Sequence, residues 1–240
     1  MQSLADKYFT FGSIDCRTYG VHISGSGTFN APARAYENIA VPGRNGDLLS
    51  QNTRLQNVLL TYPAGIVSGT KANLEGLRSA LLSVVGYARL TDTYHPDEFR
   101  LAVYKGPFSV DMVRDLSAGQ FDITFECKPQ RFLTSGETVT TVTANTAISN
   151  PTPFDARPLL RVYGYGTLKV GSTTVTITDY NNTYIDIDCE LMDCFNGSTN
   201  LNSFVTFSSN DFPTLKSGSN GVEISGSITK VEITPRWWRV

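Results

Sequence analysis

Four acidic residues in the last quarter of the chain are the first candidates for a chemical site. Asp186, Asp188 and Glu190 recur at every second residue, with Asp193 just beyond. In a strand the first three would share one face, where carboxylates could bind calcium. An EF-hand loop beginning at Asp186 needs glycine at its sixth position and glutamate at its twelfth, where the chain has leucine and glycine. The favoured interpretation is a solvated strand face, which could lie at a subunit contact, and no metal site is predicted.

Two histidines, His22 and His95, are the candidates for a general base. Serine and cysteine nucleophiles need such a base within hydrogen-bonding reach. His22 lies among small residues of an expected strand and His95 lies in a polar turn, so both are interpreted as satisfied or solvent-facing side chains. No G-x-S-x-G elbow is present. With 22 acidic residues, carboxylate pairs that could cleave a glycoside carry no specificity. We predict no catalytic residues and a protein that is not an enzyme.

Cofactor binding has no better support. The glycine pairs Gly25/Gly27 and Gly164/Gly166 are followed by neither the Lys-Ser/Thr pair nor the helix of a phosphate-binding loop, and we interpret both as turns or bulges. The cysteines form no C-x-x-C pair and are predicted to be buried free thiols: Cys16, Cys127, Cys189 and Cys194. No cofactor is predicted.

Two adjacent tryptophans, Trp237 and Trp238, stand at the end of the chain. Exposed indole rings could stack on a sugar or anchor a protein partner. Val231 and Ile233 lead into them along an expected strand, so the favoured alternative is that the tryptophans close the core of the last domain.

Composition narrows the class of protein further. The formal net charge is −2 and the pI is near 5.7, so the chain has no basic footprint for tight nucleic-acid binding. A mildly acidic protein is compatible with lining a DNA conduit, because repulsion keeps phosphates from adhering. The first residues do not form a signal peptide, and no segment reaches the ~20 apolar residues of a membrane span. We expect a soluble protein made in the cytoplasm.

The first half is expected to combine strands with one helix. Residues 120–128 alternate apolar and polar side chains, which is the clearest strand signal. Residues 71–85 place Leu74, Leu77, Leu81 and Val84 on one stripe, with Thr70 as N-cap and Gly86 as the stop. Because a lone amphipathic helix among strands must cover a sheet, this stripe is expected to belong to the core. Further strands are expected at 21–29, 34–41 and 55–62, and a hairpin at 101–110.

The second half is expected to be entirely β. Turn residues separate short strands at roughly 8–12-residue spacing, which is typical of a β-sandwich. These strands are expected at 159–163, 167–170, 173–178, 184–188, 204–207, 222–225 and 228–234. A Thr-rich stretch followed by Asn-Pro-Thr-Pro separates the halves. We predict an N-terminal domain at 1–132, a linker at 133–149 and a C-terminal domain at 150–240.

Short motifs, in a fixed order along nearly the whole chain, resemble those of the distal tail proteins of long-tailed, non-contractile phages. In the first half they lie at 9–12 (Phe-Thr-Phe-Gly), 41–48 (Val-Pro-Gly-Arg-Asn-Gly-Asp-Leu), 104–106 and 121–129. In the second half they lie at 150–153, 158–166, 185–188, 210–215, 218–220 and 235–238 (Pro-Arg-Trp-Trp). No single motif is decisive, and the resemblance rests on their order and spacing.

The resemblance implies a mainly β protein with two β-sandwich domains. The first would be of the tail-tube type with a flanking helix and would form a hexameric ring, or a double ring, around a channel that DNA crosses only transiently. The second would be a galectin-like sandwich outside the ring. Such a virion protein is a hub at the distal end of the tail. Its partners would be the tail tube protein, the tail-tip protein and, in many phages, receptor-binding proteins, with no membrane contact.

Within this resemblance, the loop at 41–48 is a candidate ring or axial contact through Arg44, Asn45 and Asp47, although a solvent-exposed hairpin turn explains it equally well. The chain has no large insertion that could be a separate sugar-binding domain. The alternative function is a carbohydrate-binding adhesin or lectin-like module that uses Trp237 or Trp238. A hydrolase is disfavoured because no histidine constellation supports one.

Overall fold

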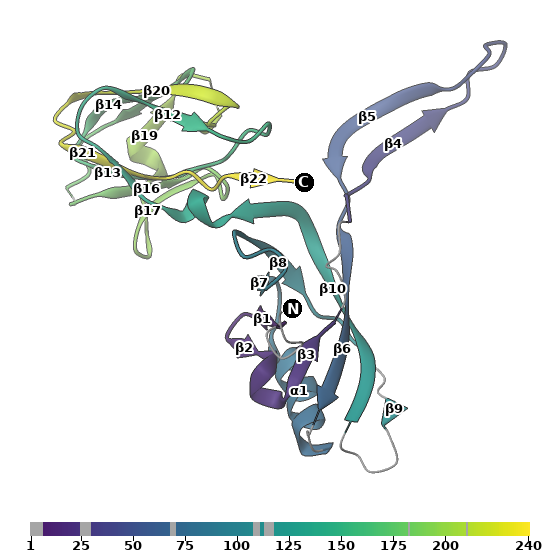
Figure 1. The fold of residues 1–240 in the computed structure, drawn as a ribbon. Helices are drawn as coiled ribbons and strands as arrows, with labels where there is room; N and C mark the ends of the chain where they lie inside the picture. The colour runs from purple at the N-terminus through teal and green to yellow at the C-terminus, as the bar shows by residue number, and fades with distance from the viewer. Residues whose placement is uncertain are drawn as a thin grey trace. The chain divides into compact units, whose positions relative to one another are not determined.

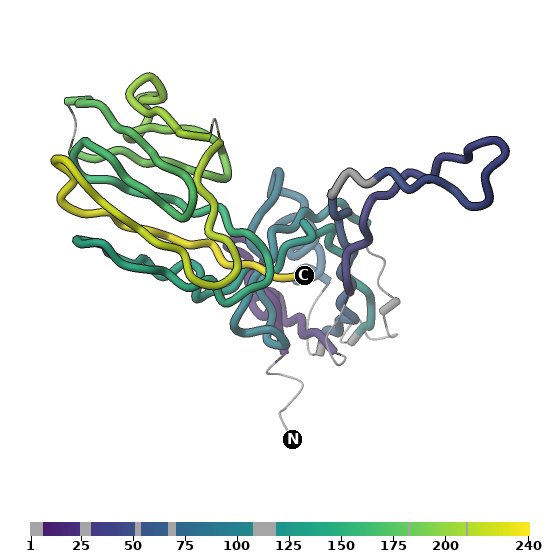
Figure 2. Tube along the Cα trace, turned by 90° about the horizontal axis from the view of Figure 1, so that it is seen from above, coloured from purple at the N-terminus to yellow at the C-terminus, as the bar shows by residue number. Residues whose placement is uncertain are grey.

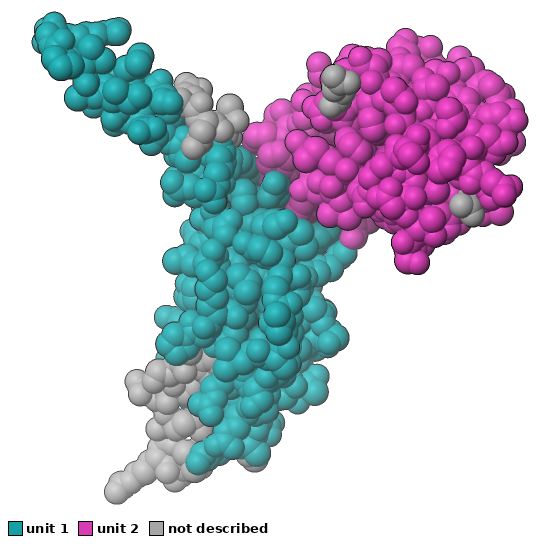
Figure 3. Space-filling model, turned by 180° about the vertical axis from the view of Figure 1, so that it is seen from behind, with its two compact units in different colours: residues 1–131, 240 teal, residues 132–239 magenta. Residues whose placement is uncertain are grey.

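The computed structural model describes residues 7–24, 30–67, 71–107, 111–112, 118–181, 183–209 and 211–240. The chain divides into two compact units, residues 1–131 with Val240 and residues 132–239 (Figure 3). Strands dominate both units, which confirms the predicted mainly β class. Each unit has its own hydrophobic core, so each is described separately.

The first unit is built on an antiparallel sheet whose strands run in the order β2-β1-β7-β8-β10-β6-β3 (Figure 1). Its strands are β1 (Phe9–Phe11), β2 (Ile14–Asp15), β3 (Val21–Ile23), β6 (Val58–Val67), β7 (Ala88–Asp92), β8 (Glu98–Val103) and β10 (Ala118–Leu133), and β9 (Asp111–Met112) pairs with β10. A 3-10 turn, η2 (Cys16–Tyr19), joins β2 to β3. The remaining pair of strands in this unit, β4 and β5, forms a separate hairpin.

The alternation predicted for residues 120–128 is confirmed in β10. Phe121, Ile123, Phe125 and Cys127 are buried, whereas the residues between them face outward. The strand is longer than predicted, and it pairs with β6 from Ala118 opposite Val67 to Cys127 opposite Val58. Phe125 is the centre of an aromatic cluster. The centroid of its ring lies 5.0–6.1 Å from the ring centroids of Phe9, Phe11, Tyr62 and Tyr104.

The helix α1 (Lys71–Ser83) covers this core, as its stripe of leucines predicted. Leu74, Leu77 and Leu81 are buried in the same cluster as the aromatic rings. The helix ends two residues before the predicted boundary, and Gly86 follows with φ = 83°, a conformation that favours glycine. Thr70, the predicted N-cap, lies outside the described residues.

The second unit is a two-sheet β-sandwich, as predicted. One sheet has the order β11-β21-β13-β16-β17-β18 and the other has the order β12-β20-β14-β15-β19. The strands are β11 (Thr140–Val142), β12 (Thr146–Asn150), β13 (Leu159–Tyr163), β14 (Gly166–Val170), β15 (Thr173–Ile177), β16 (Ile185–Asp188), β17 (Asp193–Asn196), β18 (Thr199–Asn200), β19 (Val205–Phe207), β20 (Gly218–Gly226) and β21 (Lys230–Thr234). The short turns η3 (Thr134–Glu137) and η4 (Asn202–Phe204) and the strand β22 (Trp238–Arg239) complete the unit.

The predicted linker at 133–149 is wrong. β11 pairs with β21 and β12 pairs with β20, so this stretch supplies a strand to each sheet of the second unit. Val142 and Ile148 are buried in its core. The Thr-rich composition that suggested a linker is also favourable for strands, because β-branched side chains fit a pleated surface.

Two strand predictions in the first unit also need correction. The strand expected at 55–62 spans the break between β5 (Leu48–Leu55) and β6, and the one expected at 34–41 ends at Ile39. Of the strand expected at 21–29, the first three residues form β3, and residues 25–29, with Gly25 and Gly27, lie outside the described part of the chain.

Candidate functional site

A β-hairpin arm made of β4 (Arg34–Ile39) and β5 projects from the sheet of the first unit (Figure 1). Among the described strands, β4 and β5 pair only with each other. The pairing runs from Arg34 opposite Leu55 to Ile39 opposite Leu48 and is shifted between Arg34 and Tyr36. At about 3.4 Å per residue, the eight residues of β5 span about 27 Å, which is enough to reach a neighbouring molecule.

The three predicted contact residues lie at the tip of this arm. Arg44, Asn45 and Asp47 are exposed, and neither charge has an ion pair within the described structure. Gly43 and Gly46 adopt φ angles of 80° and 81°, which lets the chain reverse. The tip therefore presents one positive and one negative side chain to solvent.

Apolar residues of the arm are unusually exposed. The exposed fractions are 38–50% for Tyr36, Ile39, Val41, Leu48 and Leu49. Since alternate residues of a strand face opposite sides, Tyr36 and Leu49 lie on one face of the ribbon, and Ile39 and Leu48 lie on the other. An isolated two-stranded hairpin is marginally stable in water, and exposed contiguous apolar surface marks an interaction site. The arm thus has the properties of a binding element.

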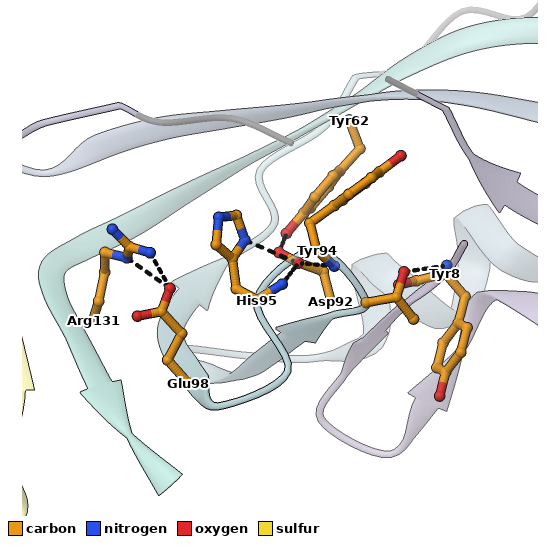
Figure 4. Close-up of polar contacts among 8 residues, drawn as sticks. Tyr8, Tyr62, Asp92, Tyr94, His95, Glu98 and Arg131 are labelled. Carbon is orange, nitrogen blue, oxygen red and sulfur yellow. Dashed lines mark hydrogen bonds and ion pairs between the residues drawn. The ribbon is translucent and has the colours of Figure 1, made fainter. Parts of the chain in front are cut away.

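His95 belongs to a buried polar cluster at the turn between β7 and β8 (Figure 4). Asp92 accepts a hydrogen bond from the Tyr62 hydroxyl at 2.6 Å and from the backbone amides of Tyr94 and His95 at 2.9 Å each. The His95 Nδ1 atom lies 3.0 Å from the same carboxylate. Burial and the Asp92 charge raise the pKa of Tyr62 well above its usual value. This arrangement fixes the turn and gives the His95 Nδ1 atom a polar partner.

A second buried contact supports the same turn. Arg131 donates to the Glu98 carboxylate from both Nε, at 2.9 Å, and Nη2 (Figure 4). Thr93 exchanges hydrogen bonds with the backbone of Tyr8, which ties the turn to the start of the unit. Nucleophilic catalysis by the Asp92–His95 pair would need a reactive nucleophile beside it. Burial raises the pKa of the Cys127 thiol to about 12, so it is protonated at neutral pH.

The other histidine, His22, lies on β3 opposite Gly65. Its side chain is half-buried, and its Nδ1 atom has no hydrogen bond within the described structure. Neither histidine is therefore placed in a catalytic arrangement by the contacts described.

The four acidic residues Asp186, Asp188, Glu190 and Asp193 do not form the solvated strand face that was predicted, because the first two are buried. Asp186 and Asp188 on β16 are 5% and 4% exposed. Arg161, from the neighbouring strand β13, donates two hydrogen bonds to Asp186 at 2.8 and 2.9 Å. Arg236 does the same for Asp188 at 2.7 and 2.8 Å. The prediction failed because each carboxylate is neutralised by an arginine from a distant part of the sequence.

The other two acidic residues have local partners. Glu190 is exposed beyond the end of β16, 4.0 Å from Arg157. Asp193 accepts hydrogen bonds from the amide side chains of Asn200 and Asn202 at 3.1 and 2.7 Å. Among the described residues, no group of three or more His, Cys, Asp or Glu side chains could hold a metal ion.

The two tryptophans have different environments. Trp237 is 6% exposed and lies in the core of the second unit, as the favoured interpretation predicted. Trp238 is half-buried, stacks on Phe154 with a ring separation of 4.4 Å, and donates from Nε1 to the Asp155 carbonyl oxygen at 2.9 Å. Of the two candidate contact residues, only Trp238 retains accessible ring surface.

The remaining sequence candidates are structural. All four cysteines are free and buried, as predicted, and burial raises the pKa of each thiol. Gly164 and Gly166 have φ angles of 97° and 140°, and a Cβ atom on either would lie 2.2–2.3 Å from a backbone oxygen of the facing strand segment. They are the close turn that the sequence suggested. Within the described residues, no helix is long and apolar enough to cross a membrane.

Comparison with known proteins identifies the class to which these features belong. Residues 14–127 match the model of the phage tail protein RIFT-related domain. The whole chain is similar to the crystal structure of the SPP1 Dit protein, described as a paradigm of the hub adsorption apparatus in phages that infect Gram-positive bacteria. The TM-score is 0.68 at 14% sequence identity, and the alignment covers 98% of this chain and 99% of that chain. No curated protein sequence matches the chain.

Residues 14–127 of this β-rich chain, all of them in the first unit, are thus similar to the RIFT-related domain of phage tail proteins. Along nearly its whole length the chain has the fold of the SPP1 Dit protein, in agreement with the resemblance seen in the sequence.

Proposed function

We propose that the protein is a structural subunit of a hexameric ring at the distal end of a long non-contractile phage tail. The observation that carries the proposal is the arm of residues 34–55, whose exposed apolar side chains have no cover in the described part of the chain. A partner would supply that cover, and identical subunits that bind head to tail form a ring where the rotation between them closes. The fold of the SPP1 Dit protein supports the same conclusion.

In this proposal the ring joins the tail tube protein to the tail-tip protein and to receptor-binding proteins, and DNA crosses its channel only during infection. The arm tip, with Arg44, Asn45 and Asp47, contacts a neighbouring subunit or an axial partner. The protein has no catalytic turnover. The carbohydrate-binding alternative is disfavoured, because Trp237 is buried and Trp238 is already stacked on Phe154.

Electron microscopy and native mass spectrometry of the purified full chain test the proposal. We expect single or double rings with six subunits in each ring. Antibody labelling of virions should place the protein at the tail end farthest from the head. A protein that stays monomeric at all accessible concentrations, and that is absent from virion tails, would refute this function.

A further inference from the structure

A second exposed apolar surface lies on the first unit, at the end of α1. The exposed fractions are 55% for Leu82, 95% for Val85 and 46% for Tyr87, and Leu59 on β6 is 60% exposed. We call these four residues the helix-end patch. Soluble proteins rarely leave several large apolar side chains together on a polar-rimmed surface unless a partner covers them.

Polar contacts link two members of the helix-end patch, Leu59 and Tyr87. The Asn57 side chain donates to the Tyr87 hydroxyl at 3.0 Å and to Glu126 Oε1 at 2.7 Å. Glu126 is the cross-strand partner of Leu59. Leu59 and Tyr87 therefore flank one hydrogen-bonded group and belong to the same surface.

The rim of the helix-end patch carries two lysines. Lys105 forms an ion pair with Glu126 at 2.5 Å, and Leu82 packs near the adjacent Gly106. The Lys128 ammonium lies 5.2 Å from the centre of the Tyr87 ring. Lys128 is thus held over the patch beside an aromatic face, where an incoming carboxylate could pair with it.

One face of the arm matches this surface in both apolar character and charge. Ile39 and Leu48 lie directly opposite each other, and Val41 follows just beyond β4. Glu37, two residues before Ile39, lies on the same face, and within the described structure its carboxylate has no ion pair. We call this the Ile39–Leu48 face. The other face carries Tyr36, Asn38 and Leu49, and the Ile39–Leu48 face differs from it in carrying the Glu37 carboxylate.

We propose that the Ile39–Leu48 face of one copy binds the helix-end patch of a second copy, with Glu37 beside Lys128. This inference rests on the proposed ring and names the surface that receives the arm. The arm extends away from α1 (Figure 1), so a copy does not cover its own patch. Because the donor and acceptor surfaces differ, every copy can use both at once, which gives a ring, provided that the rotation between copies closes, rather than a two-fold dimer.

Disulfide cross-linking of the full chain tests the contact directly. The native thiols are buried and protonated, so Leu48→Cys and Val85→Cys together provide the reactive pair. Oxidation should give a ladder of covalent oligomers that rises one chain at a time to six. Leu48→Cys with Leu191→Cys, an exposed site on the second unit, is the matched control and should give no ladder. Efficient dimers from Leu48→Cys alone would show arm-to-arm pairing and overturn the proposal.

Substitutions on each surface provide an independent measurement. Val85→Asp should raise the dissociation constant of the ring at least about tenfold, as expected for a central apolar contact, while Val139→Asp on the second unit leaves it unchanged. Because the Val85 side chain is almost fully exposed, the melting temperature of the dissociated subunit should not change. Glu37→Lys should weaken the ring, and Lys128→Glu should restore it in the double variant.

The outcomes separate this inference from the proposed function. Rings that persist in Val85→Asp, with no ladder from the cysteine pair, would refute the helix-end patch as the acceptor and leave the ring intact. Absence of rings in the unsubstituted protein would refute both.

Discussion

The buried ion pair between Arg236 and Asp188 should be a large determinant of the stability of the second unit. Two hydrogen bonds of 2.7 and 2.8 Å join the side chains, and Asp188 is 4% exposed. Arg236→Met removes the partner but keeps most of the apolar stem. The carboxylate then stays buried without its counter-charge, which costs about 3–5 kcal/mol. The Arg236 side chain is 29% exposed, so solvent already screens part of the interaction. We therefore expect a loss of stability near the lower end of this range, about 3 kcal/mol.

For a unit spanning residues 132–239, a loss of about 3 kcal/mol corresponds to a decrease in melting temperature of roughly 12–15 °C. Scanning calorimetry of the full chain measures it. Asp188→Asn in the Arg236→Met background should recover about half of the loss, because the neutral amide needs no counter-charge. If Arg236→Met costs less than about 1 kcal/mol, or if the two losses simply add, the assigned role of the pair is wrong.

The pH dependence of the same pair has a defined sign. Burial alone would raise the pKa of Asp188, but hydrogen bonds from Arg236 and from the backbone amides of Leu191 and Glu190 lower it below the ordinary value of 3.8. A carboxyl whose pKa is lower in the folded state stabilises the fold above its unfolded pKa and loses that contribution as the pH falls. Without Arg236, burial raises the pKa of Asp188 in the variant. The stability difference between the unsubstituted chain and Arg236→Met should therefore be full near neutrality, shrink as the pH falls toward 3.8, and continue to shrink below it.

Three further predictions concern the two cores. Gly136→Ala should destabilise the second unit by more than about 2 kcal/mol in a denaturant titration, since the new Cβ would lie 2.3 Å from the Trp237 backbone nitrogen; a neutral effect would contradict this close packing. Tyr62→Phe should cost about 1–3 kcal/mol by the same measurement, because Asp92 loses a 2.6 Å hydrogen bond in a buried site, and an unchanged midpoint would argue against the cluster. A thiol reagent at pH 8 should modify none of the four cysteines in the folded chain and all four in denaturant; rapid labelling of the folded chain would disprove their burial.

Sequence patterns predicted the elements whose burial follows a local period. The alternation in β10 and the leucine stripe of α1 each encode one buried face, and both were placed correctly. Strands without such a period were missed. β5 reads Leu-Leu-Ser-Gln-Asn-Thr-Arg-Leu, which has no alternation because neither face of the arm belongs to the core of its own chain. β1 and β7 are short strands buried by partners far away in the sequence.

The candidate site was found only in part, for a related reason. The turn at 41–48 predicted Arg44, Asn45 and Asp47 as contact residues, and the structure places them at the arm tip. The exposure of the apolar residues beside that turn was not predicted, because the residue type alone does not distinguish an exposed leucine from a buried one. Likewise, nothing local to Asp186 indicates that Arg161, 25 residues away in the chain, neutralises it.

The structure thus contains buried carboxylates and exposed large apolar side chains, two unusual placements. The two differ in whether they require a partner molecule. Asp186 and Asp188 are buried, but arginines of the same unit neutralise them, so they require no other molecule. Leu48 and Val85 are exposed, and no described part of the chain covers them. Burying apolar surface is favourable by roughly 25 cal/mol per Å², so only the second group gains free energy from a partner. By this criterion the arm and the helix-end patch, rather than the charged clusters, are the surfaces that the proposed assembly would use.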